Sequence, residues 1–177
     1  RTADLLDGAA AHPTATPTPC PGMDLGALVD HVVTWAQVFA GGATGEPYEG
    51  DPFAFHIELA DAAAAYRAVA RRIVDGWRTH GLDRDVLGFS GTSPGRMSFG
   101  MTLMEEIAHG CDVATATGQD TDYPSEAIEL ALSAAHEYLL PEYRGPESFG
   151  EIVPVPDDAP PIDRYLGFMG RHPHPTA

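Results

Sequence analysis

The sequence predicts an all-α protein: one four-helix bundle spanning residues 1–177, with a Pro-rich C-terminal extension over residues 142–177. Two observations predict this class. Four segments repeat apolar residues at helical spacing, and no segment shows the alternation that is typical of a half-buried strand. The length suits a single domain, and a composition with 44% hydrophobic and 20% charged residues is typical of a folded globular chain.

The first expected helices are separated by proline and glycine. A short helix is expected from Thr2 to about Ala11, before a Pro-rich stretch. Asp24 is a favourable N-cap for the first long helix, which Gly41 and Gly42 are expected to end. The apolar face of this helix comprises Leu25, Leu28, Val32, Trp35 and Phe39.

The second long helix is expected to begin at Asp51 and Pro52, because a capping residue followed by proline is a favoured helix start. Gly81 is expected to end this helix. Residues 82–99 are rich in glycine, serine and proline, and they are expected to form a loop rather than a regular element.

The remaining helices follow this loop. The third long helix is expected from about residue 98 or 101 to Gly118, and the fourth from near Pro124 to just before Pro141. Within the Pro-rich extension, a short helix at residues 162–168 is expected to pack on the bundle. Four long helices joined by moderate loops favour an antiparallel bundle.

Charge excludes two classes of partner. The formal net charge is −16, and all ten basic residues are arginine. Nucleic acids and anionic membranes both need clustered positive charge, so neither is an expected partner. Neither a membrane-spanning apolar segment nor a leader with a basic and then an apolar part is visible, so the cytoplasm is the expected location. Two cysteines make no disulfide framework.

The third long helix carries a polar stripe on a mostly apolar surface. Glu105, His109 and Asp112 stand at positions i, i+4 and i+7, and they therefore share one narrow face. A helix that is apolar around most of its circumference is normally buried, and an unpaired charge is costly in the interior. The stripe therefore needs a partner that satisfies it.

A divalent cation would satisfy these groups. Glu105 and His109 can each donate one ligand atom, and His31 on the first long helix is the best candidate for a third. Asp112 is placed to hold the other ring nitrogen of His109 or to face a substrate. Two imidazoles and one carboxylate leave coordination positions open, as catalytic sites do. The same spacing more commonly forms an ion pair or a hydrogen bond, so a buried network without metal remains an alternative.

Three stretches resemble a known family. Thr18 to His31 reads TPCPGMDLGALVDH and resembles the "T-P-C-x-G-W-x-x-x-x-L-x-x-H" motif of the DinB/YfiT-like superfamily. Glu105 to Gly118, EEIAHGCDVATATG, is similar to "E-x-x-x-H-x-W-D-x-A-x-A-x-G". Asp163 to Arg171, DRYLGFMGR, resembles a closing "D-R-L-x-x-F-x-G-R". These motifs are those of the actinobacterial branch related to the N-terminal domain of mycothiol-dependent maleylpyruvate isomerase.

The resemblance implies a DinB-like bundle in which His31, Glu105 and His109 hold a divalent metal ion and Asp112 serves catalysis by binding substrate or thiol. Zinc is the first choice of metal, with nickel, manganese and iron as alternatives, and mycothiol is an implied co-substrate. A coordinated thiol or water is a nucleophile near neutral pH.

The implied function is that of a metal-dependent thiol transferase, isomerase or hydrolase. It would act on a small electrophilic molecule in detoxification or secondary metabolism. A non-catalytic module that binds a metal or a small ligand is the alternative. The expected partners are therefore a small-molecule substrate and, as a homodimer, a second copy of the chain.

Two positions depart from the family pattern. Met23 and Cys111 stand where the motifs have tryptophan, and both changes are expected to reshape the wall of a cavity. Cys111 lies about 240° around its helix from Glu105, so it is expected to point away from the site and to act as a small hydrophobic residue. Packing is also the expected role of Cys20.

Overall fold

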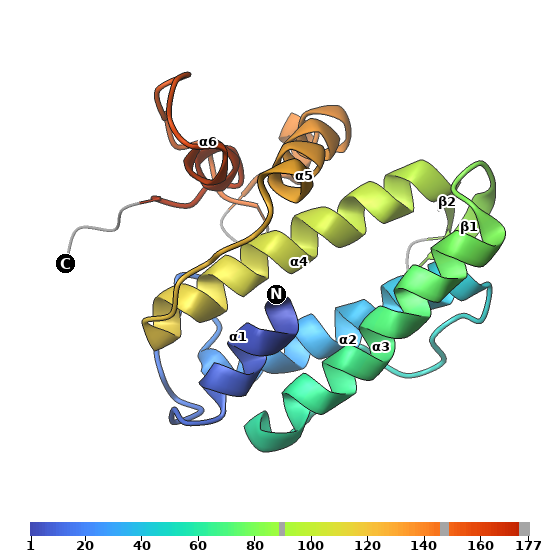
Figure 1. Ribbon diagram of the computed structural model, residues 1–177, viewed down its shortest axis with the longest axis horizontal. Helices are drawn as coiled ribbons and strands as arrows, with labels where there is room; N and C mark the ends of the chain where they lie inside the picture. The colour runs from blue at the N-terminus through green and yellow to red at the C-terminus, as the bar shows by residue number, and fades with distance from the viewer. Residues whose placement is uncertain (89–90, 146–148, 174–177) are drawn as a thin grey trace.

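The computed structural model describes residues 1–88, 91–145 and 149–173, and within them it confirms the all-α class (Figure 1). The predicted extension at 142–177 therefore lies partly outside the described residues, at 146–148 and 174–177. The helices are α1 Thr2–Ala9, α2 Leu25–Thr44, α3 Leu59–His80, α4 Gly95–Thr117, α5 Ser125–Tyr138 and α6 Pro161–Phe168, with a 3₁₀ turn at Pro141–Tyr143. Within the described ranges, no helix is both long enough and apolar enough to cross a membrane.

The two helices that carry the candidate ligands begin or end on local signals that the sequence reveals. The Asp24 side chain accepts a hydrogen bond from the Ala27 N–H at 2.9 Å, as an N-cap does at the start of α2. Gly118 follows α4 with a left-handed φ of 67°, which glycine adopts without steric cost. These local signals set where α2 begins and where α4 ends.

The predicted end of α2 at Gly41 and Gly42 is wrong. Both glycines lie inside the helix, which continues to Thr44 and stops at the left-handed Gly45. Gly41 is needed for a close approach instead, because a Cβ there would lie 3.0 Å from the backbone at Glu46 and Pro47. A glycine that packing requires inside a helix therefore has the same sequence signal as a helix terminator.

The predicted start of α3 at Asp51 and Pro52 is also wrong, because the helix begins at Leu59. The Asp51 side chain instead accepts a hydrogen bond from the Phe53 N–H at 2.9 Å, closing a turn. An Asp-Pro pair suits a turn as well as a helix start, and the chain uses it here for the turn.

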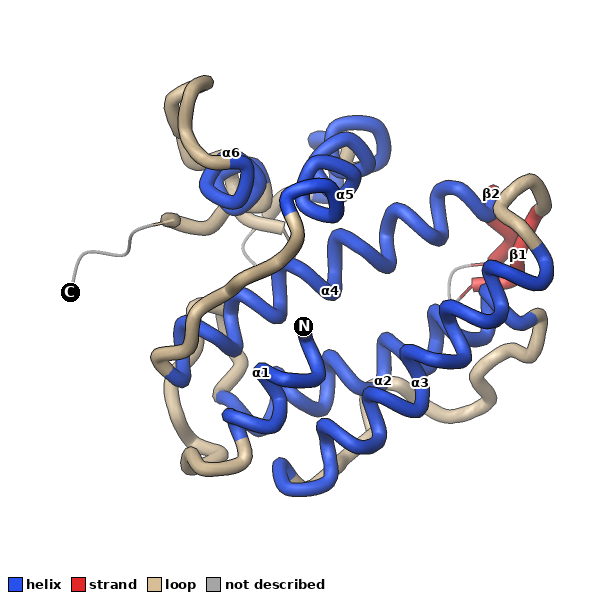
Figure 2. Tube along the Cα trace, viewed as in Figure 1, coloured by secondary structure: helices blue, strands red, loops and turns tan. Residues whose placement is uncertain are grey.

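Residues 82–99 are not a simple loop. Strands β1 Asp85–Gly88 and β2 Gly91–Pro94 form a two-stranded antiparallel hairpin in which Val86 pairs with Ser93, and α4 begins at Gly95. Most strand residues are exposed and Val86 alone is buried, so the segment lacks the apolar alternation from which a strand is normally predicted. Figure 2 shows the hairpin at the end of the molecule where α4 starts.

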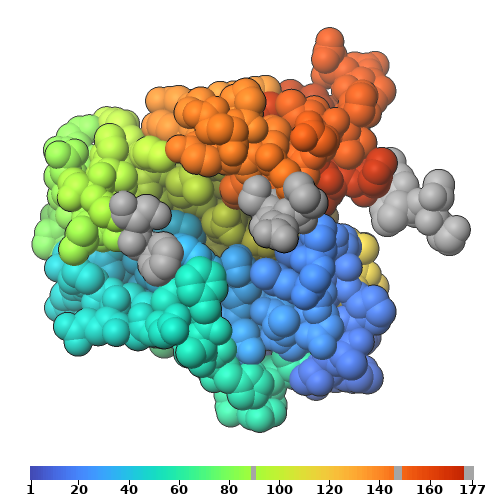
Figure 3. Space-filling view, turned by 180° about the vertical axis from the view of Figure 1, so that it is seen from behind, coloured from blue at the N-terminus to red at the C-terminus, as the bar shows by residue number. Residues whose placement is uncertain are grey.

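The buried residues form two clusters, and both include residues of α4. The larger cluster joins α1, α2, α3 and Val113 and Ala114 of α4, so α1 supplies a wall of the larger core although it was expected only as a short preceding helix. The smaller cluster joins α4, α5 and α6. In Figure 3 the C-terminal residues, in orange, lie above the N-terminal helices, in blue. α4 therefore serves as the central element of the fold.

The described part of the C-terminal extension is anchored to α4. Tyr165 of α6 is fully buried, and its hydroxyl donates a hydrogen bond of 2.5 Å to the Met104 carbonyl oxygen. Met169 is also fully buried in the same cluster. This anchoring suits the expected single domain, with the extension and the bundle unfolding together.

Changing Tyr165→Phe is expected to lower the free energy of unfolding by about 1 kcal/mol, because the Met104 carbonyl would remain buried without its donor. One cooperative transition should remain in thermal melting followed by circular dichroism, with a midpoint lower by about 3 °C. Tyr143→Phe is the control, since Tyr143 is half exposed and water can replace its partner. Two separate transitions would contradict a single domain.

Candidate metal centre

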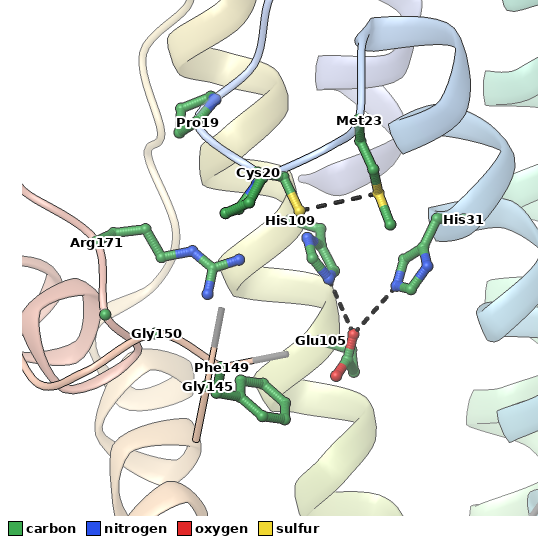
Figure 4. A pocket seen from close by; sticks show the side chains of 12 residues that line it. Pro19, Cys20, Met23, His31, Glu105, His109, Gly145, Phe149, Gly150 and Arg171 are labelled. Carbon is green, nitrogen blue, oxygen red and sulfur yellow. Dashed lines mark hydrogen bonds and ion pairs between the residues drawn. The ribbon is translucent and has the colours of Figure 1, made fainter. Parts of the chain in front are cut away.

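Three side chains from two helices converge between α2 and α4. His31 lies on α2, while Glu105 and His109 lie one turn apart on α4. A carboxylate oxygen of Glu105 lies 3.0 Å from Nε2 of His109 and 3.5 Å from Nε2 of His31 (Figure 4). The two imidazole rings stand edge to face with centroids 4.7 Å apart. One ligand atom from each residue lies within 4.8 Å of the other two, a spacing that fits a shared cation.

The His109 ring is oriented by a buried carboxylate. Nδ1 of His109 lies 3.0 Å from Asp112 Oδ2, and Asp112 is 1% exposed. Because a carboxylate only accepts hydrogen bonds, Nδ1 carries the proton and Nε2 faces Glu105. The polar stripe therefore places Asp112 behind the His109 ring, where it fixes the orientation of the ring.

Arg171 completes this arrangement from the far end of the chain. Arg171 follows α6 in the chain. Its guanidinium donates to both carboxylate oxygens of Asp112, through Nη2 at 2.7 Å and Nε at 3.3 Å. It also donates through Nη1 to the Met169 carbonyl at 2.8 Å. The sequence predicts no role for Arg171 beyond its place at the end of the closing DRYLGFMGR motif, which is the available signal for it. A contact between residues 59 positions apart could not be read from helical periodicity.

The electrostatics of the site show strong coupling. Burial by itself would raise the pKa of Glu105, but its interactions with His109 and His31 hold that pKa well below its usual range. Burial would lower the pKa of His109, but Asp112, Cys20 and Glu105 together raise it well above its usual value. Without a metal ion, a proton on Nε2 of His109 would balance Glu105. A cation would have to displace that proton, so binding should release it.

The donor set fits a divalent metal ion. His31 Nε2 is buried, and among the described residues it has no hydrogen-bond partner. Its 3.5 Å separation from Glu105 is an ion-pair distance rather than a hydrogen bond. Two imidazole nitrogens and one carboxylate oxygen are ligands that zinc, nickel, manganese and iron accept, and three protein ligands leave room for a further one.

A cavity of about 250 Å³ opens on these ligands, and we call it the polar cavity. In Figure 4 the Arg171 guanidinium, Met23 and Phe149 surround the space beside the His109 ring. The lining residues come from the Pro-rich segment, α2, α4 and the C-terminal extension: Pro19, Cys20, Pro21, Met23, His31, Glu105, His109, Gly145, Phe149, Gly150, Gly170 and Arg171. The Pro-rich segment, the two helices and the C-terminal extension therefore enclose the site together.

The two cysteines occupy different surroundings. Cys20 lines the polar cavity, with its sulfur 3.8 Å from that of Met23, and it also lies close enough to His109 and Asp112 to share an ion with them. Packing alone, the role expected for Cys20, therefore does not describe its position. Cys111 is buried at 3% exposure in the smaller core cluster, as its helical position predicted.

Cys111 is expected to be inert to thiol reagents. Burial, with the nearby Asp112 charge, raises the pKa of its thiol to about 12, so about one molecule in ten thousand carries the thiolate at pH 8. Titration of the native protein with Ellman's reagent should modify one thiol, and titration in denaturant two. Cys20→Ser should abolish the native reaction, and a native reaction that persists in this variant would contradict the burial of Cys111.

Comparisons with known proteins give one family match and two similar relatives. Residues 1–114 match the sequence model of the mycothiol maleylpyruvate isomerase N-terminal domain family, and this stretch includes all three candidate ligands. Two similar relatives are uncharacterized proteins of Mycobacterium tuberculosis, from strains CDC 1551 and H37Rv. Each is 32% identical over 170 residues, which cover 96% of this chain and 91% of the relative. No solved structure matches the chain.

Proposed function

Because the chain belongs to the mycothiol maleylpyruvate isomerase N-terminal domain family, which is DinB-like, metal-binding and mycothiol-related, we propose that it is a metal-dependent enzyme acting on a small electrophilic molecule. In this proposal His31, Glu105 and His109 hold one divalent ion, and a thiol such as mycothiol, or water, is the nucleophile. The proposed reaction is a thiol transfer, an isomerisation or a hydrolysis.

One observation carries the proposal: Nε2 of His31, Nε2 of His109 and a carboxylate oxygen of Glu105 converge within 4.8 Å beside a cavity. A bound divalent ion lowers the pKa of a thiol or water that it coordinates and so supplies a nucleophile near neutral pH. Two histidines and one carboxylate leave room for such a ligand, and the cavity leaves room for a substrate.

The residues behind the ligands have defined parts in this proposal. Asp112 keeps the proton on Nδ1 of His109, so that the Nε2 lone pair faces the site. Arg171 uses three of its five N–H donors on Asp112 and Met169, which leaves two for a ligand in the polar cavity. Phe149 and Met23 line the same cavity with apolar surface and would limit access of water to the nucleophile.

Charge balance favours an anionic ligand. With neutral imidazoles, a divalent ion and Arg171 supply three positive charges, and Glu105 and Asp112 supply two negative ones. The remaining single positive charge suits one thiolate or another monoanion. A buried site with unbalanced charge is costly, so the arrangement should bind anionic thiols better than neutral ligands of the same size.

A turnover assay tests the proposal. Zinc-loaded protein is incubated with 1-chloro-2,4-dinitrobenzene or an α,β-unsaturated ketone, and with mycothiol, glutathione or no thiol. With the aryl chloride, an S–C bond forms, chloride leaves and the thiol proton passes to solvent. With the ketone, sulfur bonds to the β-carbon and the proton ends on the α-carbon. Product formation should exceed that with EDTA-stripped protein by at least about tenfold, and no excess with any thiol would favour a non-catalytic binding module.

A site without metal is the second candidate, and the 3.0 Å contacts of both His109 ring nitrogens with Glu105 and Asp112 favour it. A protonated His109 held between these two carboxylates is balanced by itself, although Nε2 of His31 then has no hydrogen-bond partner among the described residues. Metal analysis of purified protein separates the two candidates. Stoichiometric zinc with tight retention during dialysis supports the enzyme, and absence of affinity for zinc, nickel, manganese and iron supports the network.

A further inference from the structure

Two rows of apolar side chains lead away from the candidate ligands, one on each facing helix. On α2, Trp35 and Phe39 follow His31 at intervals of four residues. On α4, Met101 and Met97 precede Glu105 at the same interval. Residues four apart share a helix face, so each row begins at a candidate ligand and continues for two further turns.

These rows line a second cavity of about 520 Å³, which we call the apolar cavity. Val38 and Ser98 also line it, and Gly88 and residues 91–94 of the β1–β2 hairpin close it at the end away from the ligands. His31 and Glu105 line both the apolar cavity and the polar cavity. The candidate metal centre therefore lies between two cavities of different chemistry.

The apolar cavity has the lining of a site for an uncharged group. Among its described lining residues, His31 and Glu105 are the only ionisable ones, and both lie at one end. The rings of His31 and Trp35 lie 5.9 Å apart, and those of Trp35 and Phe39 lie 6.2 Å apart, which forms a short aromatic wall. The methionines opposite are flexible and adapt to ligands of different shape.

Exposure distinguishes this cavity from a gap in the core. Trp35, Phe39, Met97 and Met101 are all only partly buried, although large apolar side chains beside a core are usually covered. A concave, mostly apolar space with a few polar groups at one end is the common form of a small-molecule site. The eight helical steps from His31 to Phe39 rise about 12 Å, which limits the ligand to a group of that length.

We propose that the apolar cavity binds the apolar or aromatic body of the electrophilic substrate, with its reactive group at the His31–Glu105 end, while the polar cavity beside Arg171 holds the anionic thiol. The assignment of the two cavities to two reactants rests on the proposed function. The proposal that the apolar cavity binds a ligand is independent of it, because the walls of this cavity are formed by side chains that need no metal ion.

Binding of N-phenyl-1-naphthylamine, an uncharged probe that fluoresces in apolar surroundings, tests the cavity on EDTA-stripped, full-length protein. Met101→Trp should fill the cavity and weaken probe binding at least tenfold. Thr92→Trp should obstruct the apolar cavity from the hairpin side. Because Thr92 is exposed, this second variant should leave the packing of the core unchanged. Leu130→Trp is the matched control, because Leu130 lies exposed on α5, outside the lining of the cavity.

A second arm tests the separation of the two cavities. Zinc-loaded protein is titrated with the probe in the presence and absence of saturating 2-mercaptoethanol, a small thiol that is a monoanion once its sulfur is deprotonated. Independent cavities predict a change of less than about twofold in probe affinity, and competition between the two would overturn the assignment. Failure of wild-type protein to bind the probe, or equal binding by wild type and both cavity variants, would overturn the ligand site. Loss of zinc binding alone would overturn only the proposed function.

Discussion

His31→Ala is expected to lower the affinity for zinc by about 100-fold or more. Removing a residue that hydrogen-bonds to a metal ligand typically lowers metal affinity by about 10- to 100-fold. Removing the ligand itself should therefore lower the affinity by at least about 100-fold. His31 is the only candidate ligand on α2, so its removal leaves Glu105 and His109 on a single helix. Zinc affinity is measured by competition with a chromophoric chelator after the protein has been stripped with EDTA.

His80→Ala is the matched control. It removes the same imidazole ring from an exposed position at the end of α3. This variant should bind zinc as wild type does. His31→Ala should lower the stability of metal-free protein only modestly, because it removes the 3.5 Å ion pair with Glu105 but breaks no hydrogen bond of Nε2 among the described residues. Equal zinc affinity in the two variants would remove His31 from the site and with it the proposed enzyme.

Asp112→Asn is expected to lower the free energy of unfolding of metal-free protein by about 3 kcal/mol. The change leaves the Arg171 guanidinium buried without its carboxylate, and breaking a buried ion pair from one side commonly costs this much. It also replaces one of the two acceptor oxygens by an N–H donor and removes the negative charge behind His109, so zinc affinity should fall by about 10- to 100-fold. Urea denaturation in EDTA measures the first effect, and chelator competition the second.

Asp75→Asn controls for loss of a carboxylate, because Asp75 is exposed on α3 and its replacement should change stability by less than about 0.5 kcal/mol. Adding Arg171→Met to Asp112→Asn removes both buried charges. The double variant should therefore be more stable than the sum of the two single changes predicts. Strict additivity would mean that the pair is not coupled.

The effect of Asp112→Asn should also depend on pH. Burial would raise the pKa of Asp112, but His109 and Arg171 together lower it below 3.8 in the folded state. A carboxyl group with a lowered folded-state pKa contributes stability that is complete above its unfolded value and is lost as pH falls through the folded value. The contribution of the carboxylate to the difference between wild type and variant should therefore be complete at about pH 5 and shrink below about pH 4. A difference that grows between about pH 5 and about pH 3 would contradict this assignment.

Local signals account for much of the fold and for part of the site. Asp24 starts α2 by capping its backbone, and Gly118 ends α4 because it adopts a left-handed conformation. The four-residue spacing of Glu105 and His109 places both side chains on one face of α4 in any helix. These features depend on residues within a few positions of one another, so they can be read from the chain.

Other features were missed because the same local signal serves two purposes. Asp51 and Pro52 close a turn where a helix start was predicted, and Gly41 permits close packing where a helix end was predicted. The β1–β2 hairpin is too short and too exposed to leave an apolar alternation. In each case the choice depends on neighbours that are distant in the sequence.

The sequence by itself determined that the chain is helical and that Glu105, His109 and Asp112 share a face, because helix geometry depends only on local backbone spacing. Only the tertiary structure decided that His31 lies 3.5 Å from Glu105, that Arg171 reaches Asp112, and that two cavities meet at the candidate ligands. Those relations join segments up to 140 residues apart in the chain, from His31 to Arg171. They follow from how buried apolar surfaces pack, which no local pattern encodes.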